Sequence, residues 1–167
     1  MALLKSLIPI IQSEDVVRAA VRENTQQTSD DQLTEEDWHM ILDHDLNDPT
    51  KSVAVQFTKG DYIIKQGVFY KKIFQIVSGT CIVEKEDPVT NQTSVLNYIH
   101  SGATLGEYNF FTGNAASASV VANFRLVEVY LIDKEHLCNL IQSHPQTVYR
   151  FYKHLCNVAS ERVVTHH

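Results

Sequence analysis

The middle of the chain alternates between hydrophobic and polar residues in short segments separated by turns. Val53, Val55 and Phe57 follow this two-residue period, and residues 126–132 repeat it. A period of two predicts β-strands with one buried face, and glycines between the segments indicate tight turns. The strands expected from this pattern cover residues 53–57, 62–64, 73–77, 81–84, 94–99 and 126–132, and Ser78-Gly79 predicts a hairpin between the third and the fourth.

Helical periodicity occupies both ends of the chain. Apolar residues recur at helical spacing over residues 13–24, and Thr34, followed by three acidic residues, caps a second helix that would bury Trp38. After the last strand, helices are expected over residues 134–142 and 145–163.

The order of these elements predicts the fold class. Many short strands with no β-α-β alternation favour a mainly β structure with flanking helices (α+β), built as an antiparallel β-roll or jelly roll. We expect one compact domain, with residues 1–51 as an N-terminal helical segment, residues 52–133 as the β-roll and residues 134–167 as two C-terminal helices.

Composition and charge restrict the class of partner. The chain has 167 residues, of which 44% are hydrophobic and 20% are charged, and these values are ordinary for one soluble globular domain. The formal net charge of −6 argues against nucleic acid as a partner, because proteins that bind the phosphate backbone normally carry a basic face.

The cysteines and the apolar N-terminal run bear on the cellular location. Cys81, Cys138 and Cys156 are an odd number and form no C-x-x-C pair, which predicts reduced thiols. Residues 1–11 are apolar but too few to span a bilayer. Together these observations predict a cytoplasmic protein without a transmembrane segment.

The most informative segment covers residues 105–122, LGEYNFFTGNAASASVVA. Gly106-Glu107 opens a single helical turn over residues 108–111, and the run of small residues 115–119 leads into a further extended segment. A helical turn presents free backbone N–H groups, and small side chains let a ligand approach the backbone closely. The segment therefore predicts a ligand loop that suits an anion.

This loop resembles the phosphate-binding cassette of cyclic nucleotide-binding domains, with the pattern F-G-E-x-A-L, a short loop, and P-R-[AST]-A-[ST]-V. The match runs through Leu105-Gly106-Glu107 and then Ala115-Ala116-Ser117-Ala118-Ser119-Val120. Two glycine frames of the same family precede it, over residues 57–67 and 73–80. The resemblance implies cAMP or cGMP as ligand, no other cofactor, and a binding site formed by Gly106, Glu107, Tyr108, Ala116, Ser117, Ala118 and Ser119.

One departure from the family pattern sets the expected affinity. Ala116 occupies the position of the arginine that holds the cyclic phosphate in the family. Losing one partner of a desolvated charge pair typically costs about 2–5 kcal/mol, so the chain is expected to be a divergent member that binds weakly or no longer binds.

The remaining polar residues of the loop each have two interpretations. Glu107 either accepts a hydrogen bond from the ribose 2′-hydroxyl or only caps its own helical turn. Ser117 and Ser119 are expected on one face of an extended segment, where they either line a pocket or face solvent. A hydroxyl at position 117 is also found in cGMP-preferring relatives, which gives a slight lean to cGMP.

The resemblance also gives the last helix a role. In the family the equivalent segment closes over the base as a lid and relays occupancy to an effector. The lid candidates here are Phe151, Tyr152, Leu155 and Val158. A stripe at this spacing is also typical of a helix that packs on a core, so both interpretations stay open.

Two function classes remain after this reasoning, and neither is an enzyme. The histidines lack metal-ligand spacing, and no nucleophile motif occurs, so we expect no metal and no catalytic residues. The first hypothesis is a sensor that relays cyclic nucleotide occupancy to a protein effector in cis or in trans. The alternative is a protein-interaction or scaffold module with the same fold, for which Ala116 is the main observation.

Overall fold

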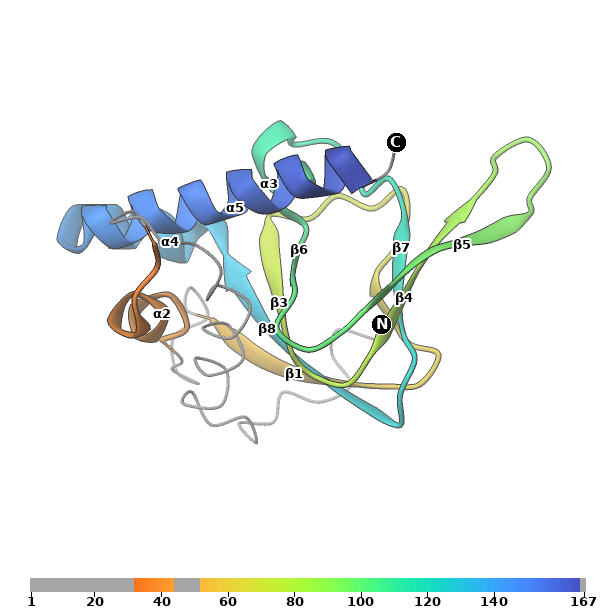
Figure 1. Cartoon of the computed structure of the whole chain (residues 1–167), viewed down its shortest axis with the longest axis horizontal. Coiled ribbons are helices and arrows are strands. Elements are labelled where there is room, and N and C mark those ends of the chain that lie inside the picture. Colours follow the sequence, from red (N-terminus) through yellow and green to blue (C-terminus); the bar gives the residue numbers. More distant parts are fainter. Residues whose placement is uncertain (1–31, 44–51, 166–167) are drawn as a thin grey trace.

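The strands of the chain form two four-stranded antiparallel sheets. The computed structural model describes residues 32–43 and 52–165 (Figure 1). In chain order the elements are α2 (Glu35–Ile41), β1 (Val53–Thr58), β2 (Tyr62–Ile64), β3 (Lys72–Ser78), β4 (Cys81–Glu86), β5 (Thr93–Ile99), β6 (Thr104–Leu105), α3 (Glu107–Thr112), β7 (Ser119–Ala122), β8 (Leu126–Asp133), α4 (Lys134–Ser143) and α5 (Pro145–Thr165). The sheet orders are β1-β8-β3-β6 and β2-β7-β4-β5.

These sheets confirm the predicted class, an antiparallel β-roll with flanking helices. All six expected strands are present, while the two-residue strand β6 was not expected because two residues carry no periodicity. The helix predicted over residues 13–24 lies outside the described residues. The division into three segments stays a prediction.

The alternating residues of both sheets fill a common core. Its members are fully or nearly fully buried and include Val55, Phe57, Phe74, Ile76, Val127 and Val129. The predicted hairpin between β3 and β4 turns at Gly79, whose φ is 90°. A Cβ at Gly79 would lie 2.8 Å from the Leu126 carbonyl oxygen, so only glycine fits this turn without strain.

A second core lies under the helices. Trp38 of α2 packs edge-on against Phe151 of α5, with ring centroids 5.8 Å apart. Ile41, Leu42 and Leu155 are fully buried in the same cluster. Figure 1 places α2 and α4 at one end of the roll, and α5 packs against α2, α3 and α4. Among the described residues, none of the helices has the length and apolar character needed to cross a membrane.

Asp37 connects the N-terminal and C-terminal helices through a buried carboxylate. Its Oδ2 accepts a hydrogen bond from the Thr34 backbone N–H at 2.9 Å and so completes a capping box. Its Oδ1 accepts from the Thr147 hydroxyl at 2.7 Å and from Arg150 at 3.2 Å. Burial alone would raise the pKa of Asp37, but the hydrogen bonds from Thr34 and Thr147 and the Arg150 charge outweigh it and lower the pKa.

Candidate functional site

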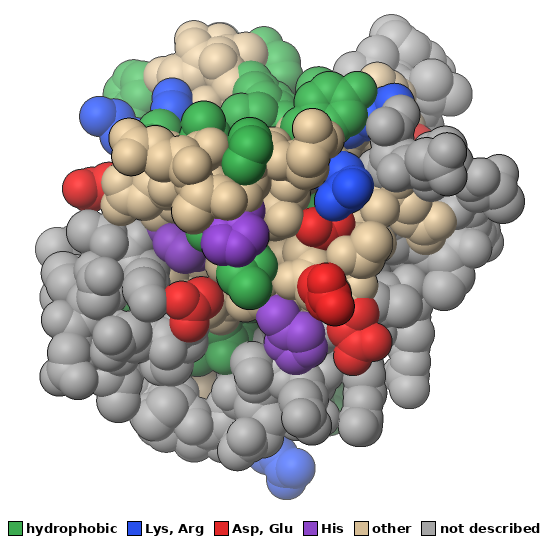
Figure 2. Space-filling model, turned by 90° about the vertical axis from the view of Figure 1, so that its left-hand side faces the viewer, with side chains coloured by type: hydrophobic (Ala, Val, Ile, Leu, Met, Phe, Trp, Pro, Cys, Tyr) green, Lys and Arg blue, Asp and Glu red, His purple; other side chains and the backbone are tan. Residues whose placement is uncertain are grey.

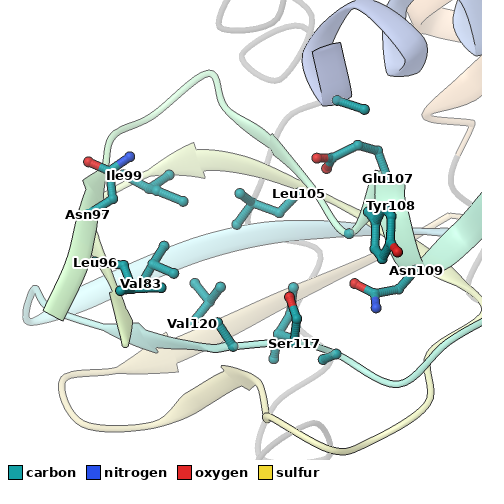
Figure 3. Close-up of a pocket in the computed structure, with 15 residues that line it drawn as sticks. Val83, Leu96, Asn97, Ile99, Leu105, Glu107, Tyr108, Asn109, Ser117 and Val120 are labelled. Atoms are coloured by element: carbon teal, nitrogen blue, oxygen red, sulfur yellow. The ribbon is translucent and has the colours of Figure 1, made fainter. Parts of the chain in front are cut away.

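A cavity of about 580 Å³ lies between the predicted ligand loop and the sheet that contains β4 and β5 (Figure 3). Its lining residues are Ile64, Val83, Leu96, Asn97, Ile99, Leu105, Gly106, Glu107, Tyr108, Asn109, Ala116, Ser117, Ala118, Val120 and Ala159. Six of the seven predicted site residues are in this set, and Ser119 is the exception. The structure therefore brings most of the loop together around one space of ligand size.

Gly106 and Glu107 define the start of the loop helix. Gly106 has a left-handed conformation with φ of 87°, and a Cβ there would lie 3.2 Å from Phe74. This turn starts α3, so that Glu107 is its first residue. Glu107 is 4% exposed, and Figure 3 shows its carboxylate pointing into the cavity. A carboxylate in this place can accept hydrogen bonds from a hydroxylated ligand.

Ala116 is held rigidly in the wall of the cavity. Its backbone N–H donates to the Val68 carbonyl at 2.9 Å, and its own carbonyl accepts from the Gly67 N–H at 2.8 Å. The Ala116 side chain is buried in the apolar core of the roll. None of the described lining residues is Lys, Arg or His, so within this set a ligand anion meets only neutral donors and the Glu107 carboxylate.

The two serines of the loop point in different directions. Ser117 lines the cavity, and Figure 3 shows its hydroxyl turned toward the interior. Ser119 is buried, and its Oγ accepts a hydrogen bond from the Gln66 backbone N–H at 2.9 Å. The expectation of one common face was wrong because the chain bends at residues 117–118, so strand alternation begins only at Ser119.

Asn109 closes the loop and was not predicted. Its side-chain amide donates to the Ala115 carbonyl at 2.6 Å and to the Asn114 carbonyl at 3.2 Å. These bonds tie α3 to the segment that follows it and shape the mouth of the cavity. Asn109 lies in a polar stretch of the loop, but its bonding partners depend on the loop conformation and not on sequence spacing.

The apolar walls were also not predicted. Val83 of β4 and Leu96, Asn97 and Ile99 of β5 lie across the cavity from Glu107. Their strands were expected, but no sequence signal states that β5 would be the edge strand next to the loop. The missing information is the strand pairing.

The lid candidates do not line the cavity in this structure. Phe151 and Leu155 are fully buried in the helical core, which agrees with the packing alternative. Tyr152 is half-buried against Phe110 and Phe111, with centroids 6.2 and 5.8 Å from its ring. Val158 is also half-buried. The residue of α5 that lines the cavity is Ala159.

A buried polar chain joins α5 to the loop. His154 Nε2 lies 3.3 Å from the Thr104 hydroxyl, which donates to the Gln75 side-chain oxygen at 2.5 Å. Gln75 in turn donates to the Gly102 carbonyl at 2.9 Å. Thr104 and Leu105 form β6, directly before Gly106, so these hydrogen bonds connect α5 to the start of the loop.

Metal binding and cysteine reactivity find little support in the described residues. Within residues 32–43 and 52–165, no group of three or more His, Cys, Asp or Glu side chains could hold a metal ion. Burial raises the pKa of the Cys81 thiol to about 12, which makes it inert at neutral pH.

Comparisons with known proteins agree with this geometry. The model of the cyclic nucleotide-binding domain family matches residues 54–144. Cyclic GMP-binding protein C from Dictyostelium discoideum is 30% identical over 139 residues, which are 80% of this chain and 5% of that protein. This chain therefore spans only a small part of that relative.

Solved structures share the fold at low sequence identity. A cyclic nucleotide-binding domain from Methylobacillus flagellatus is 16% identical with a TM-score of 0.76, covering 92% of this chain and 79% of that chain. The regulatory domain of Toxoplasma gondii PKA with cAMP is 16% identical with a TM-score of 0.61, covering 88% of this chain and 48% of that chain. Because the family match covers more than half of the sequence, the chain belongs to the cyclic nucleotide-binding domain family.

Proposed function

We propose that this chain is a non-catalytic regulatory domain that binds cGMP or cAMP weakly and relays occupancy through its C-terminal helices. The observation that carries the proposal is the buried Glu107 carboxylate, which points into a cavity built from the family's ligand loop. Glu107 accepts from the ribose 2′-hydroxyl, while Ser117 and the loop backbone donate to the phosphate.

Support for a cyclic nucleotide comes from similarity as well as geometry. The family to which the chain belongs is defined by cyclic nucleotide binding, and the Dictyostelium relative is named for cyclic GMP binding. The cavity of about 580 Å³ has the size of pockets that bury small ligands.

Weak affinity follows from Ala116. An alanine methyl group offers no hydrogen bond to a phosphate oxygen, and its place in the apolar core leaves the anion to neutral donors. A loss of about 2–5 kcal/mol turns a nanomolar site into a micromolar or weaker one.

The relay would pass through α5. Ala159 lines the cavity, and the His154–Thr104 hydrogen bond attaches the same helix to β6. Figure 2 shows hydrophobic side chains gathered on the upper half of one face, where Figure 1 places α4 and α5. Ile141 and Tyr149 on these helices are exposed, which supports contact with a protein effector in cis or in trans.

The proposal includes a cytoplasmic location and no nucleic-acid partner. The three cysteines are free thiols in the structure, as expected in a reducing compartment. The net charge of −6 disfavours binding to a phosphate backbone.

A scaffold module is the second candidate, and Ala116 favours it. If the phosphate site has been lost, the same fold and exposed helices would still support a protein contact. Under this hypothesis the cavity has no nucleotide ligand.

Titration calorimetry with cGMP and cAMP up to millimolar concentration separates the two candidates. Saturable binding with a matching rise of Tm supports the sensor. Hydrogen exchange on α5 with and without nucleotide then tests the relay, since only a sensor changes protection there. Absence of binding by both nucleotides contradicts the sensor and favours the scaffold.

A further inference from the structure

The outer face of the sheet β2-β7-β4-β5 carries a continuous row of apolar side chains. Tyr62 of β2 pairs with Val121 of β7, and Val121 also pairs with Ile82 of β4. Ile82 pairs in turn with Tyr98 of β5. Directly opposed residues share one face of a sheet, with Cβ atoms about 4.5–5.5 Å apart. The row therefore crosses the whole sheet, from the edge strand β2 to the edge strand β5.

Burial shows that this row faces away from the core of the roll. Its chain neighbours Val120, Ala122 and Cys81 belong to the buried core, and successive residues of a strand point to opposite faces. Tyr62 and Tyr98 are 43% and 56% exposed. In the part of the chain that the structure describes, the helices pack mainly on β3 and β8 of the other sheet (Figure 1). A contiguous apolar surface left open in this way is typical of an interaction site.

A β-bulge adds one more apolar residue to the face. Glu84 of β4 pairs with Val95 of β5, whereas the preceding pair joins residues 83 and 97, so Leu96 is the extra residue. Val95 therefore lies beside Glu84 on the outer face, and it is 52% exposed. The bulge widens the apolar surface at the β5 edge.

Charged residues of opposite sign flank the row. Lys65 Nζ lies 5.8 Å from the centroid of the Tyr62 ring, so Lys65 extends over the outer face at the β2 edge. Glu84 follows Ile82 by two residues on β4 and shares its face. Because β2 and β4 are both antiparallel to β7, they run in the same direction. Lys65 and Glu84 therefore lie on the same side of the row, one near each end.

We propose that this outer face is an interface at which two copies of the chain form a symmetric dimer. The row has the order Tyr, Val, Ile, Tyr, so it presents nearly the same shape from either end. A two-fold axis parallel to the strands places Tyr62 of one copy against Tyr98 of the other. The same axis brings Lys65 of each copy toward Glu84 of the other, so the facing charges attract.

The size of the face predicts a weak dimer. Neighbouring strands lie about 4.8 Å apart, so the row spans about 14 Å. A contact of this width belongs with the smaller interfaces, which bury less than about 1,200 Å² and are transient. We expect dimers that form on the order of 0.1 mM protein and dissociate on dilution. The cavity lies on the inner side of this sheet, so the dimer does not depend on the proposed nucleotide binding.

Charge reversal gives the sharpest test. Lys65→Glu and Glu84→Lys each place like charges across the interface twice per dimer, and each should weaken dimerisation by about 3- to 30-fold. The double variant Lys65→Glu/Glu84→Lys exchanges the signs and should dimerise like the wild type. An equal mixture of the two single variants should form mixed dimers, because every facing pair is then of opposite charge.

Two further variants separate this contact from general effects of charge and shape. Lys85→Glu changes the net charge as Lys65→Glu does, but Lys85 points to the opposite face from Glu84, so dimerisation should be unchanged. Tyr98→Ser removes an aromatic contact from both ends of the paired rows and should weaken the dimer at least about tenfold. Lys65, Lys85 and Tyr98 are exposed, so these variants are expected to fold, and Tm checks this.

Sedimentation equilibrium of the full chain and its variants, up to about 1 mM protein, decides the question. A dimer that the single reversals weaken and the double variant restores supports the inference. A wild type that stays monomeric at about 1 mM overturns it. A dimer that the single reversals and Tyr98→Ser leave intact uses another face and also overturns it, as does a dimer that Lys85→Glu weakens as much as Lys65→Glu. None of these outcomes bears on the proposed sensor, which nucleotide titration tests separately.

Discussion

Introducing an arginine at position 116 tests the proposal that Ala116 makes cyclic nucleotide binding weak. Ala116 is 4% exposed, lines the cavity, and has both backbone groups hydrogen-bonded to residues 67 and 68. Because these hydrogen bonds hold the backbone, the arginine side chain of Ala116→Arg would enter the cavity from a defined position in its wall. A guanidinium in the cavity offers a fork of donors to the cyclic phosphate.

Two opposing contributions determine how much affinity for cyclic nucleotides Ala116→Arg gains. A desolvated charge pair lost by truncation is worth about 2–5 kcal/mol, or roughly 30-fold to several thousand-fold in affinity. The arginine must also be removed from water when no ligand is bound, because Ala116 lies in an apolar core. We therefore expect the lower end of the range, together with a lower Tm of the free variant.

The assay compares ligands with and without the phosphate. Calorimetry of Ala116→Arg should show cGMP and cAMP binding at least about 30-fold more tightly, while guanosine and adenosine bind as they do to the wild type. The gain should shrink as salt concentration rises. Ala116→Met has similar length but no charge, so it should give no gain for any ligand.

Two results would refute this reasoning. If Ala116→Arg folds but gains no affinity for cyclic nucleotides, the cavity differs from a phosphate site by more than one side chain. If nucleosides gain as much as cyclic nucleotides, the arginine contacts the base or the sugar. The first outcome would favour the scaffold hypothesis, and the second would show that position 116 does not face the phosphate.

Three further predictions test single features of the fold and the site. Glu107→Gln should weaken the binding of cyclic ribonucleotides by about tenfold, because hydrogen bonds to charged groups are stronger than those between neutral groups. Calorimetry with 2′-deoxy analogues checks the ribose contact, since their affinity should be the same for the variant and the wild type. Gly79→Ala should lower the free energy of unfolding by about 1–3 kcal/mol in urea denaturation because of its positive φ and close neighbours. The matched change Gly60→Ala has the same backbone strain but open space, so an equal loss there would contradict the steric explanation. Because the folded-state pKa of Asp37 is lowered, its stabilisation is present above the ordinary pKa and is lost as pH falls through the folded-state value. Tm measured down to about pH 2 should therefore fall more steeply in the wild type than in Asp37→Asn, and parallel curves would count against this role.

Local patterns predicted the elements of this fold well. Alternation located the strands near Val53 and Leu126 because one face of each is buried against the core. The Thr34 cap was readable because capping depends on residues three positions apart. The loop residues that line the cavity, 106–108 and 116–118, form two contiguous segments of the sequence, and their role as a binding site stays a prediction.

The features that were missed all depend on contacts between distant segments. Asn97 and Val83 line the cavity because of strand pairing and a bulge, neither of which has a sequence signal. Ser119 was placed on the wrong face because a two-residue bend precedes the strand. Ala159 was overlooked among larger lid candidates, although a small residue lets α5 approach the cavity.

Weak binding and effective signalling are compatible in this fold, because affinity and coupling depend on different contacts. Ala116 belongs to the roll, so under the proposed weak binding the missing phosphate contact would lower affinity equally in every position of α5. A shift of α5 needs only a ligand that binds two helix positions with different affinity. In the proposed relay, that difference would arise where α5 meets the site, at Ala159 and along the His154–Thr104 connection. A tenfold difference there would shift the helix equilibrium by about 1.4 kcal/mol whatever the absolute affinity. The missing arginine would therefore raise the ligand concentration required but leave the size of the response unchanged.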